Sequence, residues 1–124
     1  MIIHHNIRKR FGQNFLVDNN IINKIIDLIK PRKHDHFIEI GPGMGALTFP
    51  ILDRIKHLDV IEIDRDLVNA LTEHSQADQL SIHSADALKF DFNSLYHPGQ
   101  KLRLMGNLPY NISTPLLFHI LNYS

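Results

Sequence analysis

Hydrophobic residues recur along the chain at two spacings, one typical of helices and the other of strands. Over residues 18–30, isoleucine and leucine return every three or four positions, which predicts a helix that Asp18 could cap and that ends before a proline. Residues 46–55 and 64–74 also read as helices, and Asp64 is a candidate cap for the second of them.

Four short apolar or β-branched runs predict strands, at residues 37–40, 58–63, 80–84 and 102–105. Pro98 and Gly99 indicate a turn before the fourth run, and a last helix is expected where Ser113 or Thr114 precedes Pro115. Because strands alternate with helices, the sequence predicts an α/β fold with a parallel sheet covered by helices on both faces.

Glycine or polar residues follow each predicted strand. Gly41 comes after the first strand, Glu62 lies at the end of the second, Asp86 follows the third and Asn107 follows the fourth. In open parallel sheets, ligands bind beyond the carboxyl ends of the strands. The agreement of four separate positions therefore predicts one binding site along that edge.

The glycine-rich turn of residues 41–45 reads Gly-Pro-Gly-Met-Gly. Glycines allow a tight turn and let a ligand approach the backbone without obstruction from Cβ atoms. An ordinary strand-to-helix turn has the same pattern. The spacing G-x-G-x-G also differs from the G-x-G-x-x-G of dinucleotide-binding proteins, which argues against a nicotinamide enzyme.

Two acidic residues could complete a nucleoside site. Glu62 lies about twenty residues beyond the glycine turn, where a carboxylate can accept hydrogen bonds from ribose hydroxyls. Asp86, which Ala87 follows, could accept a hydrogen bond from a purine amino group while a backbone N–H donates to the ring. A surface glutamate and a capping aspartate are the structural alternatives.

The sequence Asn107-Leu108-Pro109-Tyr110 is the most specific signal in the chain. The N6 amine of adenine is a poor nucleophile because its lone pair is delocalised into the ring. The side-chain oxygen of Asn107 and the carbonyl of Leu108 could accept its two hydrogens and aim the lone pair at a methyl donor. Pro109 would stiffen the loop, and Tyr110 offers a ring for stacking.

Composition limits the remaining possibilities. The absence of cysteine rules out disulfides and thiolate metal sites and fits a reducing compartment. No apolar run approaches the ~20 residues of a membrane helix, and the first residues do not resemble a signal peptide, so we expect a soluble, cytoplasmic protein. The nine histidines show no spacing typical of metal ligands, and no metal is expected. Lys and Arg together number 13, equal to Asp and Glu, so the chain is neutral overall.

Five segments of the chain strongly resemble the small-subunit (16S) ribosomal RNA adenine N6,N6-dimethyltransferases, the bacterial kasugamycin-sensitivity family. They are residues 8–16 (RKRFGQNFL), 39–48 (EIGPGMGALT), 60–67 (VIEIDRDL), 85–88 (ADAL) and 106–115 (GNLPYNISTP). The resemblance implies a Rossmann-like class I methyltransferase fold with S-adenosylmethionine as cofactor and S-adenosylhomocysteine as product.

The resemblance also implies roles for individual residues. Gln13, Asn14 and Leu16 would close over the methionine end of the cofactor. Asn107 would touch both the cofactor and the target base, on which Tyr110 would stack. The other cofactor contacts that it implies are those of Glu39, Gly41, Gly43, Gly45, Glu62, Ile63, Asp86 and Ala87.

The family dimethylates two adjacent adenosines in the 3′-terminal hairpin loop of small-subunit RNA during ribosome biogenesis. Single-stranded loops present unstacked bases, which lowers the cost of reaching the target. The expected partner is therefore small-subunit rRNA in the pre-30S particle, with Arg8, Lys9 and Arg10 facing the RNA.

Family members run to roughly twice this length, so residues 1–124 correspond to the N-terminal portion of the catalytic domain, ending soon after the fourth strand. The activity of this portion by itself is open, and we expect self-association through the exposed fourth strand. A large-subunit adenine dimethyltransferase of the macrolide-resistance type and a non-catalytic RNA-binding or assembly module are the alternatives.

Overall fold

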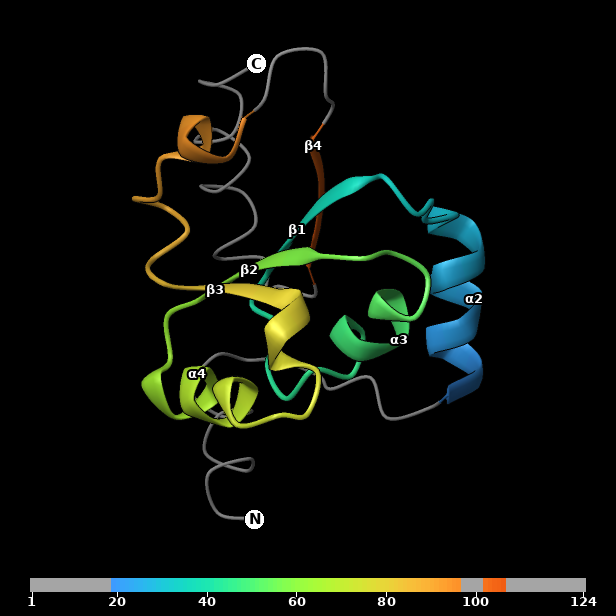
Figure 1. The fold of residues 1–124 in the computed structure, drawn as a ribbon, viewed down its shortest axis with the longest axis horizontal. Coiled ribbons are helices and arrows are strands. Elements are labelled where there is room, and N and C mark those ends of the chain that lie inside the picture. The colour runs from blue at the N-terminus through green and yellow to red at the C-terminus, as the bar shows by residue number, and fades with distance from the viewer. Residues whose placement is uncertain (1–18, 97–101, 107–124) are drawn as a thin grey trace.

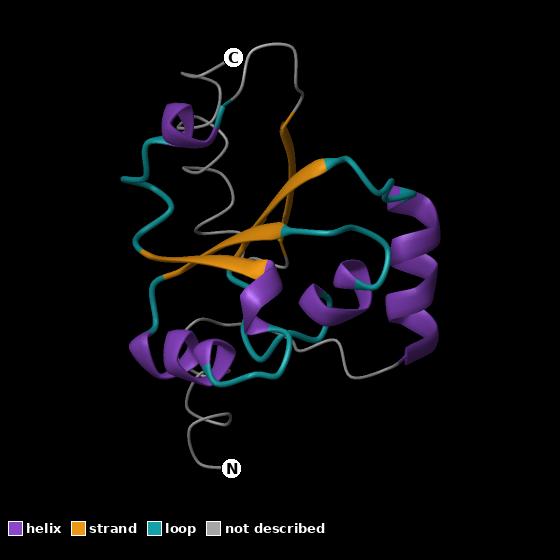
Figure 2. Cartoon of the chain, in the orientation of Figure 1, coloured by secondary structure: helices purple, strands orange, loops and turns teal. Residues whose placement is uncertain are grey.

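The computed structural model describes residues 19–96 and 102–106. Figure 1 shows their path, and Figure 2 shows the same chain by secondary structure. The elements follow one another in the order α2 (Asn19–Ile29), β1 (His36–Ile40), α3 (Thr48–Leu52), β2 (Leu58–Glu62), α4 (Arg65–Thr72), η1 (Ala77–Gln79), β3 (Leu80–Ser84), η2 (Phe92–Leu95) and β4 (Leu102–Gly106).

The four strands form one parallel sheet in the order β3-β2-β1-β4. The strands are paired so that their carboxyl ends meet at one edge. Ile40 at the end of β1 is aligned with Gly106 at the end of β4, and Glu62 at the end of β2 is aligned with Ser84. The expected parallel α/β architecture is confirmed.

The two faces of the sheet bury different clusters, because successive strand residues point to opposite sides. Phe37, Leu58 and Val60 pack with apolar residues of α2, α3 and α4 on one face. Ile38 and Ile61 pack on the other face, under η2 and the loop before it. Within the described ranges, the cover of this second face includes the short 3-10 helix η2.

Most predicted boundaries agree with the structure to within two residues, including the third strand at Leu80–Ser84. The helix predicted over residues 46–55 is wrong in length, because α3 spans only five residues, Thr48–Leu52. At its N-terminal end, the helix follows a turn in which Gly45 has a φ of 91°, and Leu47 provides no side-chain cap. The 3-10 helices η1 and η2 were not predicted. The Asp18 cap, the turn at Pro98 and Gly99 and the last helix lie outside the described residues.

Strand β4 is the edge of the sheet among the described residues, because it pairs with β1 alone. Self-association through this edge stays a prediction. No helix of the described ranges has the length and apolar character needed to cross a membrane.

Candidate functional site

The glycine turn leaves the carboxyl end of β1 in a conformation that glycine favours. Gly41, Gly43 and Gly45 have φ angles of 67°, 63° and 91°, in the left-handed region where a side chain is strained. The backbone N–H of Gly41 donates to the carbonyl of Ile61 in β2, at 2.9 Å, so the turn starts in register with the neighbouring strand.

Gly45 lies directly against the ring of Phe49. A Cβ atom at Gly45 would come within 2.2 Å of Cε2 of Phe49, far below van der Waals contact. The imidazole of His74 stacks on the same ring, with 3.6 Å between centroids and 12° between planes. The turn therefore rests on a packed aromatic pair and needs glycine for two independent reasons.

Glu62 fastens the glycine turn to the end of β2. Its carboxylate is buried, with Oε1 accepting from the backbone N–H of Gly43 at 3.2 Å and Oε2 accepting from that of Asp64 at 3.0 Å. Asp64 in turn caps α4, because its Oδ1 accepts from the N–H groups of Asp66 and Leu67. One carboxylate thus sets the relative positions of the turn, the strand end and the following helix.

Glu39 is a second buried carboxylate, on the same side of the sheet as Glu62. Only 3% of it is exposed, and its Oε1 accepts a hydrogen bond from the hydroxyl of Thr48 at the start of α3. Burial raises the pKa of Glu39 to about 7; the Thr48 hydrogen bond opposes this shift, and the nearby charge of Glu62 adds to it. Glu39 thus links β1 to α3 behind the glycine turn.

The raised pKa of Glu39 predicts a pH-dependent stability. In the unfolded chain this carboxyl ionises near its ordinary pKa of 4.5, whereas in the folded chain it holds its proton up to about 7. Its stabilising contribution is therefore complete below pH 4.5 and is lost as the pH rises to 7, by on the order of 3 kcal/mol. Glu39→Gln should remove this loss, so that the variant exceeds the parent in unfolding free energy at pH 8.

Denaturant unfolding of both proteins at pH 5 and pH 8 measures this difference. Thr48→Val provides the matched comparison, because it removes the hydroxyl that hydrogen-bonds to Glu39 but keeps the carboxyl group. A parent and a Glu39→Gln variant that respond identically to pH would contradict the raised pKa.

Asp86 lies just past the end of β3, half-buried, in a local turn. Its Oδ1 accepts from the backbone N–H of Leu88 at 3.0 Å, as in an Asx-turn. Ala87 is 8% exposed and packs in the second core cluster. The side chain of Ala87 therefore packs in the core, and the predicted cofactor contact would be made through its backbone.

Two large apolar side chains are exposed at this edge of the sheet. Met44, inside the glycine turn, is 39% exposed, and Ile63, directly after Glu62, is 51% exposed. Apolar groups beside hydrogen-bonding carboxylates are the usual composition of a small-molecule site.

The structure thus brings together, at one edge of the sheet, the predicted site residues that it describes. The other predicted residues lie outside the described ranges: Arg8, Lys9, Arg10, Gln13, Asn14, Leu16, Asn107, Leu108, Pro109 and Tyr110. Sequence reasoning missed the supports of the turn, namely Thr48, Phe49 and His74. A signal for Thr48 was present, because a glutamate inside the apolar run 37–40 requires a buried hydrogen-bond partner.

A parallel sheet with a glycine turn after its first strand and a buried acid after the next defines an α/β protein built to bind a nucleotide-like cofactor. Residues 4–124 match the family model described as ribosomal RNA adenine dimethylase. The chain belongs to this family, as its sequence motifs indicated.

The curated relatives with high identity carry a consistent name. The chain is 56% identical over 121 residues to "Ribosomal RNA small subunit methyltransferase A" of Tolumonas auensis and 58% identical over 120 residues to the protein of that name from Aromatoleum aromaticum. Each match covers 97% of this chain but 45% and 44% of the relative. The chain therefore spans somewhat less than half the length of these curated relatives.

Solved structures confirm the fold class. A dimethyladenosine transferase from Plasmodium falciparum has a TM-score of 0.70 at 28% identity, over 88% of this chain and 38% of that one. The 23S rRNA methyltransferase ErmE has a TM-score of 0.73 at 29% identity, over 87% of this chain and 43% of that one. A glycopeptide N-methyltransferase solved with S-adenosylmethionine shares the fold at 17% identity, with a TM-score of 0.55 over 80% of this chain and 43% of that one.

Proposed function

We propose that the chain carries the cofactor-binding part of an enzyme that transfers methyl groups from S-adenosylmethionine to N6 of adenosines in ribosomal RNA. One observation carries this proposal. The register of the sheet aligns Ile40, which precedes the glycine turn, with Gly106, which precedes the Asn107-Leu108-Pro109-Tyr110 sequence. The expected cofactor loop and the expected base-handling sequence therefore leave adjacent strands at the same level.

The residues around the turn fit the proposed cofactor. A nucleoside needs hydrogen-bond acceptors for its hydroxyl and amino groups, which Glu62 and Asp86 supply, and an apolar surface for its ring, which Met44 and Ile63 supply. A carboxylate has about four acceptor positions, so Glu62 can hold the turn and still accept from a ribose. S-adenosylmethionine, when bound, supplies an electrophilic methyl group.

The target amine is assigned to residues 107–110. Asn107 and the carbonyl of Leu108 accept its two N–H groups, so that its lone pair is directed at the methyl group, while Pro109 limits the motion of the loop. Tyr110 stacks on the base, a contact worth ~1–3 kcal/mol. Catalysis then depends on alignment and charge placement and requires no covalent intermediate.

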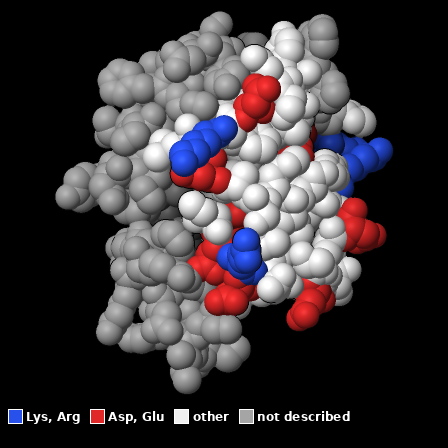
Figure 3. Space-filling view, turned by 90° about the vertical axis from the view of Figure 1, so that its left-hand side faces the viewer, with Lys and Arg blue, Asp and Glu red and all other residues white. Residues whose placement is uncertain are grey.

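The proposed substrate is the 3′-terminal hairpin loop of small-subunit RNA in the pre-30S particle, with two adjacent adenosines as targets, in the cytoplasm. The names of the relatives at 56% and 58% identity support the small subunit. Figure 3 shows interspersed basic and acidic side chains and no broad basic patch on the described part of that face. We assign the first RNA contacts to Arg8, Lys9 and Arg10 and to sequence that the longer relatives possess.

Transfer of labelled methyl groups to purified ribosomal subunits tests the proposal. We expect incorporation into the small subunit, and Asn107→Ala should lower it at least 100-fold, because an interaction made in the transition state is lost. Asn69→Ala, a change of the same kind at an exposed position on α4, should leave the rate unchanged. Equal incorporation by the parent and Asn107→Ala would remove Asn107 from the mechanism.

The same assay separates the two alternatives. Incorporation into the large subunit alone would favour the large-subunit alternative, which the structural match with the 23S rRNA methyltransferase ErmE at 29% identity also supports. RNA binding without incorporation, by a chain that binds S-adenosylmethionine, would favour a non-catalytic assembly module.

A further inference from the structure

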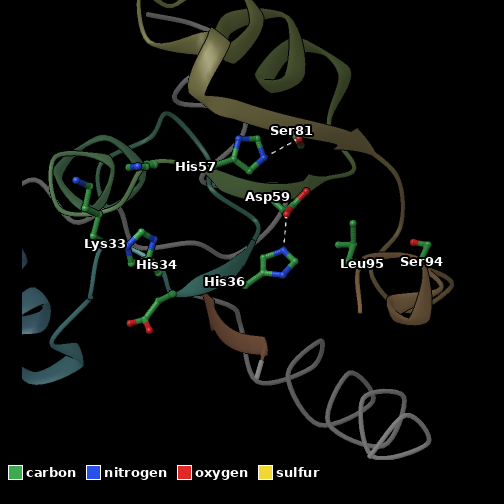
Figure 4. A pocket seen from close by; sticks show the side chains of 10 residues that line it. Lys33, His34, His36, His57, Asp59, Ser81, Ser94 and Leu95 are labelled. Carbon is green, nitrogen blue, oxygen red and sulfur yellow. Dashed lines mark hydrogen bonds and ion pairs between the residues drawn. The ribbon is translucent and has the colours of Figure 1, made fainter. Parts of the chain in front are cut away.

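A polar hollow of about 430 Å³ lies at the opposite edge of the sheet, beside the amino ends of β1, β2 and β3. Figure 4 shows His36 and Asp59 in it, Lys33 and His34 to one side, and Ser94 and Leu95 of η2 to the other. A strand of five residues separates this edge from the glycine turn, a distance of roughly 16 Å. The hollow is therefore distinct from the proposed cofactor site.

The acidic groups of the hollow already have cationic or hydrogen-bonding partners. Asp59 is 5% exposed, and its two oxygens accept from Nε2 of His36 at 2.7 Å and Nε2 of His83 at 2.9 Å. Asp35 pairs with Arg103 at 2.8 Å. The hydrogen bond from the backbone N–H of Arg32, followed by Arg103, holds the pKa of Asp35 below its ordinary value, although partial burial opposes this shift. Neither carboxylate remains available as the main partner of an incoming cation.

The two lysines of the hollow make no ion pair with a described residue. Lys33 and Lys56 line it from the loops that precede β1 and β2, and neither makes an ion pair with a residue of the described ranges. His34 lines it beside Lys33, and His57 lies beside Lys56, with its Nε2 2.8 Å from the hydroxyl of Ser81. The hollow therefore presents two lysine ammonium groups that no described carboxylate pairs with, beside imidazole and hydroxyl groups.

We propose that this hollow binds a phosphate group of an RNA backbone. Lysine, imidazole and hydroxyl groups are the usual side-chain donors to phosphate oxygens. A metal ion is the weaker explanation, because the described residues contain no group of three or more histidine or acidic side chains arranged to hold one. The choice of RNA as the source of the phosphate rests on the proposed function, whereas the phosphate chemistry rests on the hollow alone.

The test compares two double variants of the 124-residue chain that remove the same charge. Lys33→Gln with Lys56→Gln changes the hollow, and Lys24→Gln with Lys89→Gln changes exposed lysines elsewhere. Binding of a short single-stranded RNA is measured by fluorescence anisotropy over a range of salt concentrations. The hollow variant should bind about tenfold more weakly, with a salt slope reduced by about 1, and the control should stay near the parent.

Inorganic phosphate serves as the second probe. Its addition should shift the imidazole NMR signals of His34 and His57 in the parent and the control but not in the hollow variant, and it should compete with the RNA. Shifts without RNA competition would support a phosphate site but overturn RNA as its source. Equal weakening of RNA binding in both double variants, or no imidazole shifts, would overturn the site.

Ser94→Asp gives an independent variant, because it places a negative charge on the opposite wall of the hollow at an exposed residue. This variant should weaken the binding of both the RNA and inorganic phosphate, as the lysine changes do. Titration with S-adenosylmethionine of all variants separates this proposal from the proposed function: the hollow variants should keep the cofactor affinity of the parent. Failure of cofactor binding in the parent would count against the proposed function while leaving the phosphate result unaffected.

Discussion

Glu62→Ala should reduce S-adenosylmethionine binding at least 100-fold and lower the unfolding free energy by about 2–4 kcal/mol. The structure gives the reason for both effects. The substitution removes the acceptor of two backbone N–H groups, those of Gly43 and Asp64, in a buried environment. It also removes the proposed acceptor of the ribose hydroxyls, so binding loses both its partner and the loop that positions it.

Calorimetric titration with S-adenosylmethionine, beside denaturant unfolding, measures the two effects separately. Glu62→Gln keeps one side-chain carbonyl oxygen and should retain part of the stability while binding the cofactor weakly. Glu73→Ala is the matched control, because this exposed glutamate at the end of α4 should change neither quantity by more than about 0.5 kcal/mol. A Glu62→Ala protein that binds the cofactor as the parent does would exclude Glu62 from the site.

Gly45→Ala is expected to have the second large effect, a loss of about 2–4 kcal/mol in unfolding free energy together with most of the cofactor affinity. The added methyl group would lie 2.2 Å from the Phe49 ring, at a residue whose φ of 91° already disfavours a side chain. Moving the ring away would break its stacking with His74. Either this aromatic pair or the turn must therefore shift, and a shift of the turn changes the carboxyl edge of the sheet.

Two further variants separate steric clash from backbone strain. Gly41→Ala, at a φ of 67°, introduces strain without placing a methyl group against Phe49, and should cost less than Gly45→Ala. In the double variant Gly45→Ala with Phe49→Leu, the smaller and more flexible side chain should restore part of the lost stability. Thermal and denaturant unfolding of the set measures this coupling, and strict additivity of the two changes would rule out the ring as the cause.

Both predictions concern the glycine turn of residues 41–45, which is held from two sides. Glu62 holds it from β2, and Phe49 supports it from α3. Glu39 adds a third connection, from β1 to Thr48, whose strength follows the protonation of a carboxyl with a pKa of about 7. Such a turn is arranged before any ligand arrives, which reduces the conformational entropy lost on binding.

The sequence was sufficient for the elements whose signals are local. Strand β3 and helix α4 were predicted closely, because an alternation of apolar and polar residues and an aspartate cap act over a few residues. The α3 helix was overestimated because its length depends on how the glycine turn packs, and helical spacing alone carries no such information.

For the candidate site, the sequence predicted which residues carry the chemistry. It also determined at which edge of a parallel sheet the described ones gather, because that edge follows from strand order along the chain and from chain direction. Only the tertiary structure decided how they are held. It placed β4 beside β1, made Glu62 the anchor of Gly43, and put Phe49 under Gly45. It also collected four of the nine histidines around the hollow at the opposite edge, namely His34, His36, His57 and His83. These contacts join residues on separate strands and helices, and their distances are set by packing and burial, which no local pattern encodes.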